Sequence, residues 1–512
     1  ASNNEDEKSG ISLFDDIKTE LAQKICRSHS NYFESEDTPF LLVKGDLSGI
    51  QKFIYSEIDM SEAGNTRELS KKLRGRSFYI AILTDLIADL VIDHIGLAAP
   101  NLLYSGGGHF VLVAPNHPEV LQILSSINQK VNLFLHKHIG GRIDLILGSQ
   151  ACGKDLFEQT STYYPKLSQQ ISKLKLQKHK SYLSQIIHGS HSLKNREINF
   201  QDDGRMGRFL PHSEILIELR TTKPINESEK ANSSLVSYFE FEDIYRYLFM
   251  PRIKYGKGEV YDKLNEIIQE NWTSEISEII VHRVNNTDFL DPAALIYPKY
   301  PNFPISFGYV LVGTEAPKKT DEDGKLDVMD FSELSEKYIE LDEKDSTSKE
   351  LDLDFNRLGI MRLDLDNLGN IFAKGLGENP SFKRVSTLSR ELSLFFSGYF
   401  NSIARKRRMY VTYSGGDDAF VVSSWLNTMH FATDLHKHFQ KFVCHNQDLT
   451  FSSGIFICSP HFPVAKFASI TAEEESKAKS FKRVLDGKEI SKNAMSAFNH
   501  TLSWDEYPRM LG

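Results

Sequence analysis

MYVTYSGGDDAFVVSSW, residues 409–425, places two apolar segments on either side of a turn rich in glycine and aspartate. Both segments contain many β-branched and aromatic residues, which predicts two strands of one hairpin. Gly415 and Gly416 leave the backbone open to a phosphate, and Asp417 and Asp418 place two carboxylates side by side. Because adjacent carboxylates repel each other and Mg²⁺ prefers oxygen ligands, the turn predicts a metal-nucleotide site. The alternative is a solvent-exposed turn without chemistry.

A second stretch that carries carboxylates, LGIMRLDLDNLGN at residues 358–370, favours the metal site. Its first half predicts an apolar strand that ends at Asp364, and the following Asn-Leu-Gly predicts a turn into a helix. If this strand lies beside the hairpin, Asp364, Asp417 and Asp418 are expected to hold two Mg²⁺ (or Mn²⁺) ions about 3.5–4 Å apart. We therefore predict these three aspartates as the metal ligands and catalytic residues of a nucleotidyl transfer reaction.

These motifs together resemble the second palm of the large polymerase-cyclase subunit of type III CRISPR effector complexes. The segment SSGIFIC at 452–458 and the helix that ends at Lys479 also match. The first, degenerate palm of the same family is matched by three stretches in family order: KGDLSGIQKFIYSE (44–57), KKLRGRSFY (71–79) and LLYSGGGHFVLV (102–113). The resemblance covers about residues 36–150 and 355–505.

The order of predicted strands and helices agrees with the fold that this resemblance implies. That fold is α+β, with two ferredoxin-like (βαββαβ) palm domains of polymerase/cyclase type and a small insert domain between them. We expect four regions: an N-terminal helical extension at 1–37, the first palm at 38–150, the insert domain and an acidic, partly flexible linker at 151–354, and the second palm with its GGDD motif at 355–512.

Nucleotide binding is predicted for several residues near the two glycine-rich turns. The turn of the first palm lacks carboxylates, but its backbone N–H groups could cradle a phosphate. Lys479 would neutralise triphosphate charge as a point cation. The predicted nucleotide-binding residues are Gly415, Gly416, Asn367, Lys479, Ser105, Gly106 and Gly107. The alternatives are a plain tight turn in the first palm and a solvated lysine on the last helix.

The resemblance also implies a reaction and its setting. The ribose hydroxyl of one ATP would attack the α-phosphate of another, with release of pyrophosphate and formation of cyclic oligoadenylate second messengers for antiviral defence. Pairing of guide RNA with target RNA would activate synthesis, so the expected partners are the other subunits of a CRISPR ribonucleoprotein and both RNAs. Three alternatives stay open: AMP joined to S-adenosylmethionine, a free-standing cyclase, and a non-catalytic scaffold subunit.

Composition limits the class of protein further. The net charge of −9 argues against a chain that coats nucleic acid by itself, and no apolar run reaches the roughly 18 residues that span a membrane. Four dispersed cysteines without a CxxC motif indicate a cytoplasmic protein without a zinc ribbon. The 17 histidines include no His-Asp dipeptide, so we expect a form without the family's N-terminal HD nuclease domain or its DNA cleavage. The family's C-terminal helical domain is also expected to be missing.

Overall fold

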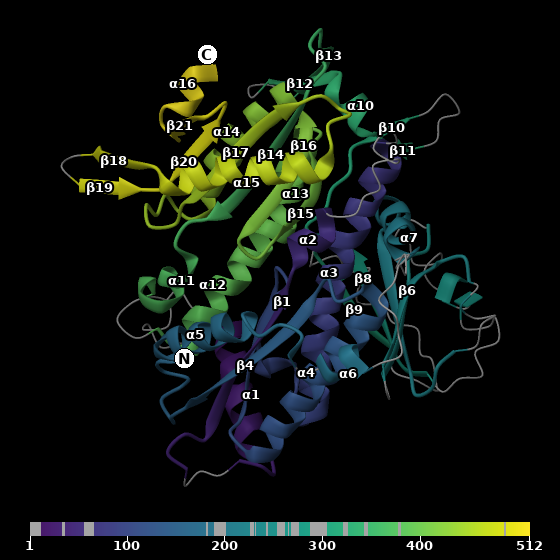
Figure 1. The fold of residues 1–512 in the computed structure, drawn as a ribbon, viewed down its shortest axis with the longest axis vertical. Coiled ribbons are helices and arrows are strands. Elements are labelled where there is room, and N and C mark those ends of the chain that lie inside the picture. The colour runs from purple at the N-terminus through teal and green to yellow at the C-terminus, as the bar shows by residue number, and fades with distance from the viewer. Residues whose placement is uncertain are drawn as a thin grey trace.

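Three β-sheets of four or more strands, with helices packed on them, form most of the structure in the described residues. The computed structural model describes residues 12–32, 36–55, 66–180, 183–188, 201–225, 230, 232–241, 244–252, 262–264, 266–267, 276–286, 305–320, 326–342, 347–376, 380–485 and 488–511. Figure 1 shows the first sheet with its helices in purple and blue, the second sheet in green and yellow above it, and the teal third sheet beside the first. The fold is therefore mixed α+β, as predicted.

The first sheet has the β-α-β-β-α-β element order that its sequence pattern predicts. Its strands pair in the order β2-β3-β1-β4, and every pair is antiparallel. The long helix α3 (Thr66–Ile95) and helix α4 (Pro118–Ile139) cross over the sheet. The four strands are β1 (Phe40–Ser48), β2 (Leu102–Gly106), β3 (His109–Pro115) and β4 (Asp144–Cys152).

The second sheet repeats this order. Its strands pair as β15-β16-β14-β17, which is the same arrangement as in the first sheet, and β20 and β21 extend it beyond β17. The strands are β14 (Leu358–Leu365), β15 (Tyr410–Gly415), β16 (Asp418–Ser424), β17 (Phe451–Cys458), β20 (Ala494–Ala497) and β21 (His500–Ser503). The helices are α12 (Phe382–Leu394), α13 (Phe400–Lys406), α14 (Trp425–Phe442) and α15 (Val464–Ser480). The single helix predicted for 382–408 is interrupted by a π-helical turn at Phe395–Tyr399.

Alternation along β14 decides which of its side chains lie on each face of the second sheet. Met361 and Leu363 pack with α12, α13 and α14 in one buried cluster. Leu358 and Ile360 lie on the opposite face, in a cluster that includes residues of α15. Because side chains alternate between faces along a strand, Asp364 lies on the same face as Ile360, under α15.

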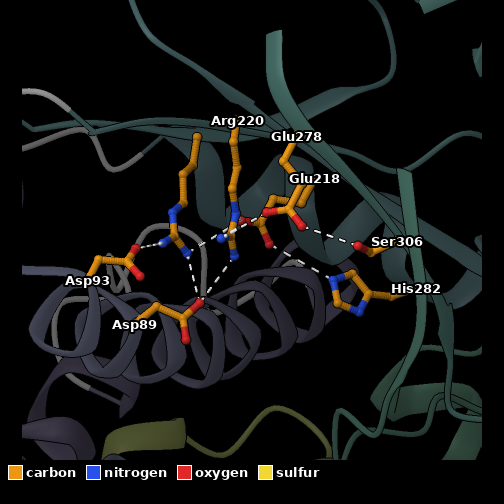
Figure 2. A network of polar contacts seen from close by, with 8 residues as sticks. Asp89, Asp93, Glu218, Arg220, Glu278, His282 and Ser306 are labelled. Atoms are coloured by element: carbon orange, nitrogen blue, oxygen red, sulfur yellow. Dashed lines mark hydrogen bonds and ion pairs between the residues drawn. The ribbon is translucent and has the colours of Figure 1, made fainter. Parts of the chain in front are cut away.

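The third sheet belongs to the insert and docks on α3 through charged side chains. Asp89 Oδ2 on α3 lies 3.2 Å from Arg220 Nη2 and 3.1 Å from Arg246 Nη1 (Figure 2). Burial would raise the pKa of Glu218, but His282, Arg246 and Arg220 lower it to about 2. The strands pair as β6-β7-β5-β8-β9, with bounds β5 (Ile215–Thr221), β6 (Leu235–Phe241), β7 (Ile244–Phe249), β8 (Ile276–Val284) and β9 (Ile305–Val310).

The described part of the acidic linker forms regular structure where we predicted partial flexibility. Helix α10 (Phe331–Ser335) begins with a capping box between Asp330 and Glu333, and Phe331 and Leu334 are buried. On either side lie two hairpins, formed by β10 (Lys318–Thr320) with β11 (Leu326–Val328) and by β12 (Lys337–Asp342) with β13 (Thr347–Asp352). Burial of a few apolar residues therefore orders a segment whose average composition is acidic.

Helix α1 (Leu13–Ser28) joins the two halves of the molecule. Its Ala22 and Cys26 are buried against the first sheet. Its fully buried Asp15 lies 3.0 Å from Nη2 of Arg390 on α12 and accepts a hydrogen bond from Thr387. None of the helices in the described ranges is long and apolar enough to cross a bilayer.

Candidate active site between the two sheets

Asp364 and Asp418 face each other across neighbouring strands. They are direct cross-strand partners in the antiparallel pairing of β14 with β16. Directly opposite residues of an antiparallel pair project to the same face, so both carboxylates lie on the face of the second sheet that α15 covers. Asp417 precedes Asp418 in the hairpin turn, and its carbonyl accepts a 2.8 Å hydrogen bond from the N–H of Leu365. The three predicted aspartates therefore come together at the end of β14.

The hairpin that carries two of them has a two-residue loop. Gly415 pairs with Asp418, which leaves Gly416 and Asp417 as the central residues. Gly416 has φ +68°, a conformation that favours glycine, whereas Asp417 has negative φ, the pattern of a type II′ turn. The glycine is thus required by the turn that presents the two carboxylates.

The two carboxylates of the turn have raised pKa values. Burial and the neighbouring Asp364 raise the pKa of Asp417 to about 6. Burial and Asp417 raise the pKa of Asp418 to about 7, although Arg362 and a hydrogen bond from Tyr413 oppose the shift. Each carboxylate therefore holds a proton more tightly than an isolated aspartate, first because burial disfavours the charged form and second because ionisation places like charges together.

Two cations from the protein partly balance this charge. Lys479 Nζ on α15 lies 2.5 Å from Asp364 Oδ1 and 3.2 Å from Glu475 Oε1. Arg362 Nε lies 2.6 Å from Glu475 Oε2, and its Nη2 lies 4.0 Å from Asp418 Oδ2. The structure therefore places Lys479 beside the three aspartates, where it contacts Asp364.

The donor set suits a hard divalent cation. Three carboxylates are ligands of the kind that Mg²⁺ or Mn²⁺ accepts, and burial together with the neighbouring carboxylates raises the pKa values of Asp417 and Asp418. Throughout the described ranges, no three His, Cys, Asp or Glu side chains converge closely enough to hold a metal as they stand. In this arrangement Lys479 is the cation that contacts Asp364.

Asp366, two residues beyond Asp364, has a structural role. It is 1% exposed and accepts hydrogen bonds from the hydroxyls of Thr450 and Ser452, each 2.8 Å long, and from the N–H of Asn493 at 3.0 Å. Its oxygens are thus occupied by donors that hold the second sheet together. Of the two aspartates that follow β14's apolar segment, only Asp364 lies beside the turn carboxylates.

The turns of the two sheets touch. A Cβ built on Gly107 would lie 3.3 Å from Gly416 Cα, and one built on Gly416 would lie 3.3 Å from Gly107 Cα. The pairing of Gly106 with His109 in the first sheet matches that of Gly415 with Asp418 in the second, so the two turns occupy equivalent positions in their sheets. The space that a side chain at Gly107 would need is therefore taken by the GGDD turn.

Residues of the two turns line two cavities. The first has a volume of about 410 Å³ and is lined by Lys44, Gly416 and Asp417, and by the rings of Tyr164 and Phe372. These two rings are near parallel, with centroids 6.3 Å apart. The second, of about 270 Å³, includes Asp418, Gly415 and Gly107 in its wall, together with Asp46 and Lys175. Both cavities thus combine residues from the two sheets.

Several residues of the first sheet were missed by sequence reasoning. Asp46 pairs with His109 just as Asp364 pairs with Asp418, and Lys175 Nζ lies 2.8 Å from Asp46 Oδ1, a counterpart of the Lys479–Asp364 pair. Comparison of KGD at 44–46 with RLD at 362–364 could have indicated Asp46. Lys175 is the last residue of helix α5 (Tyr164–Lys175).

Three of the predicted nucleotide-binding residues, Asn367, Ser105 and Gly106, do not line either cavity. Asn367 Oδ1 accepts a 2.6 Å hydrogen bond from Lys492 Nζ, and Ser105 Oγ donates to Asp85 Oδ1 on α3 at 2.5 Å. Both polar side chains bond to residues far away in the sequence, which sequence patterns do not reveal.

Comparison with known proteins places these features in a family. Residues 39–192 match the family described as Csm1 subunit domain B, and residues 357–486 match the family described as Cas10/Cmr2, second palm domain. The second match contains all three aspartates and Lys479.

Similar full-length proteins carry one description. A protein of Methanocaldococcus jannaschii is 26% identical over 91% of this chain and 60% of its own length, and one of Enterococcus italicus is 30% identical over 87% and 53%. Both are described as CRISPR system single-strand-specific deoxyribonuclease Cas10/Csm1 (subtype III-A). The chain thus spans little more than half the length of these relatives.

Solved structures share the fold. A Csm1–Csm4 cassette in complex with one ATP has a TM-score of 0.69 and 20% identity, covering 98% of this chain and 62% of that chain. Csm1 in T. onnurineus has a TM-score of 0.65 and 21% identity, covering 98% and 60%. Because both sequence families are matched in order and these relatives share one description, the chain belongs to the Cas10/Csm1 family.

Proposed function

We propose that this chain is a nucleotidyltransferase that joins ATP molecules into cyclic oligoadenylates when its complex engages target RNA. The observation that carries the proposal is that Asp364, Asp417 and Asp418 come together at a turn whose residues line two cavities. In this proposal the first and second sheets are two ferredoxin-like palms, of which only the second keeps the carboxylates. One cavity takes the donor ATP and the other takes the acceptor.

Two Mg²⁺ ions held by Asp364, Asp417 and Asp418 would supply a lowered pKa at the attacking ribose hydroxyl and charge stabilisation at the departing pyrophosphate. The protein's own contribution is position and charge. Asp418 and Asp417 must be ionised to act as ligands, and a bound cation would lower their raised pKa values by offsetting the charge of the neighbouring carboxylates. Lys479 supplies a positive charge. Its side chain contacts Asp364 in this structure and would contact the triphosphate when ATP binds.

The two cavities suit nucleotides in different ways. The 410 Å³ cavity offers the rings of Tyr164 and Phe372 for base contact, with Lys44 for phosphate and Asp417 at its end. The 270 Å³ cavity brings Asp418 together with Lys175, Gly415 and Gly107. Because both reach the same turn, nucleotides bound in them would meet at the carboxylates, which is the positioning that nucleotidyl transfer requires.

The partners in this proposal are those of related proteins. Solved relatives are described as Csm1–Csm4 subcomplexes of the type III-A interference complex, and others as bound to ATP, AMPPNP, cA3 or cA4. We propose the same kind of assembly here, with further protein subunits, guide RNA and target RNA. Four free cysteines suit the reducing cytoplasm in which such a complex would act.

Mass spectrometry of reaction products tests the function. The assembled complex is incubated with ATP and Mg²⁺, with and without target RNA and with and without S-adenosylmethionine. Cyclic oligoadenylates that require target RNA support the proposal. An adduct of AMP with S-adenosylmethionine would show that S-adenosylmethionine, and not a second ATP, is the acceptor of the same nucleotidyl transfer. If the wild type gives no product under any condition, a scaffold role is favoured.

A further inference from the structure

A cavity of about 440 Å³ lies away from the carboxylates, where α3, the third sheet and the linker after it meet the second sheet. We call it the seam cavity and define it by Arg74, Arg252, Lys318 and Arg405 and by residues 314–316. Arg74 comes from α3, Arg252 from the segment after β7, and Arg405 from α13. An occupant of this cavity would contact three parts of the chain at once.

Positive charge predominates in the seam cavity. Its wall includes four cationic side chains and two acidic ones, Glu214 and Glu315, in a chain whose overall charge is −9. Arg405 Nη2 lies 2.6 Å from Glu315 Oε2, so these two charges balance each other. Within the described ranges Arg252 forms no ion pair, and its guanidinium stacks over the ring of Phe209 at 5.0 Å. The positive charge of Arg252 is therefore available to bind an anion.

Arg74 gives an independent reason to expect a bound anion in the seam cavity. It is 2% exposed, yet no carboxylate of the described residues lies within ion-pair distance of it. Its Nε and Nη2 donate to the carbonyl of Gly207 at 3.2 and 3.0 Å, and its Nη1 donates to the Tyr410 hydroxyl. A guanidinium has five N–H donors, and buried charges are normally paired. Both acceptors are neutral, so this buried cation borders the cavity without a counterion.

His212 lies in the same wall and is affected by the same cations. Burial, followed by the charges of Arg252, Lys318 and Arg74, lowers the pKa of His212, and Asp327 opposes the shift only in part. Three cations from different segments therefore act on one point in the cavity wall.

We propose that the seam cavity binds a phosphate-bearing ligand through Arg74, Arg252 and Lys318. Guanidinium groups match phosphate oxygens in geometry, and several converging cations suit an anion with more than one charge. The volume accommodates a ligand as large as a nucleotide. This site is separate from the cavities beside the GGDD turn, because the two sets of lining residues share no member.

The wall of the seam cavity is bonded to the catalytic hairpin. Glu315 and Val411 of β15 exchange backbone hydrogen bonds of 2.9 and 3.3 Å. Next to them, Gly313 has φ +51°, and a Cβ there would lie 1.6 Å from the carbonyl oxygen of Ser414. A ligand that orders residues 314–316 would thereby order the strand that leads into the GGDD turn, so occupancy would bias catalysis without touching the carboxylates.

Calorimetric titration of the full chain tests the site. The probes are inorganic pyrophosphate, ATP and a short oligoribonucleotide, each in EDTA so that no metal bridges them to the aspartates. We expect binding by the wild type and by Lys479→Ala, and binding at least about tenfold weaker by the double variant Arg252→Ala, Lys318→Ala. Pyrophosphate binding would identify a small phosphate ligand, whereas binding of the oligoribonucleotide alone would identify a nucleic acid backbone as the source.

Arg357→Ala is the matched control, because Arg357 also stacks on an aromatic ring, Phe355 at 4.6 Å, but does not line the cavity. It should bind like the wild type. Hydrogen exchange should slow at residues 314–316 and in β15 when the probe binds. Wild-type affinity in the double variant, binding lost only in Lys479→Ala, or no binding of any probe would overturn the proposal.

Discussion

Lys479 holds Asp364 in an ion pair, with Nζ 2.5 Å from Oδ1, and so occupies one carboxylate of the three that the proposed reaction requires. Burial lowers the pKa of Lys479, but this hydrogen bond and the charge of Asp364 raise it overall. The lysine therefore stays cationic at neutral pH, and ATP with its metal ions would compete with Asp364 for it.

Replacing Lys479 with alanine should raise the KM for ATP by about tenfold, because a charge-assisted contact with phosphate is lost. Stability should change by no more than about 1 kcal/mol, since the pair is partly exposed. Steady-state kinetics of the complex and thermal melting measure both. The control is Lys477→Ala on the same helix, whose lysine pairs with Glu474 instead. Equal KM values for the two variants would remove Lys479 from the site.

The double variant Asp417→Asn, Asp418→Asn should lose at least about 10³-fold in synthesis, because two anionic ligands are gone. Its fold should persist, since the apolar residues of β15 and β16 are unchanged. Product yield and melting in EDTA are measured together. Asp366→Asn is the contrast: it should melt lower, because an amide cannot accept all three hydrogen bonds that Asp366 receives. Normal synthesis by the double variant would exclude the metal-site proposal.

The same carboxylates predict a dependence of metal-free stability on pH. Their folded pKa values, about 6 and about 7, lie above the ordinary 3.8, so the native state binds more protons than the unfolded state between these limits. Their contribution is thus fully present below about pH 4 and is lost as pH rises through 6 to 7. In EDTA, the melting temperature of the wild type should fall relative to the double Asn variant from pH 4 to 8. A constant difference across this range would contradict the raised pKa values.

Gly107→Val should lower kcat more than it raises the KM for ATP. The new side chain meets the Gly416 backbone at a φ of +59°, which valine resists, so the catalytic turn itself is displaced. A displacement near 1 Å corresponds to roughly a 10²-fold loss. Gly204→Val provides the control, because a Cβ there meets no atom within 4 Å. An effect on KM alone would indicate that Gly107 acts by contacting nucleotide.

The carboxylate site could be predicted because it depends on local rules. Alternation along a strand and a tight turn suffice to bring Asp364 beside Asp417 and Asp418. The cavity walls could not be predicted, because Tyr164 and Phe372 meet only through long-range packing. The linker hairpins depend likewise on burial of single residues such as Phe331 in a neighbouring core.

The role of a polar side chain near the turns was harder to predict than its position. Ser105 lies in the expected turn, but its hydroxyl donates to Asp85, which no spacing in the sequence indicates. Asn367 follows β14 as expected, yet Lys492, 125 residues later, binds its side chain. Hydrogen-bond partners from distant segments decide such cases.

The contact between Gly107 and Gly416 has a consequence for how the two halves can diverge. After an internal duplication, a copy that has given up its carboxylates would ordinarily be free to accumulate substitutions. Here the carboxylate-free turn forms part of the wall against which the carboxylate-bearing turn rests. Selection on the carboxylate-bearing turn therefore extends to the carboxylate-free turn. Position 107 should remain glycine for as long as position 417 remains aspartate.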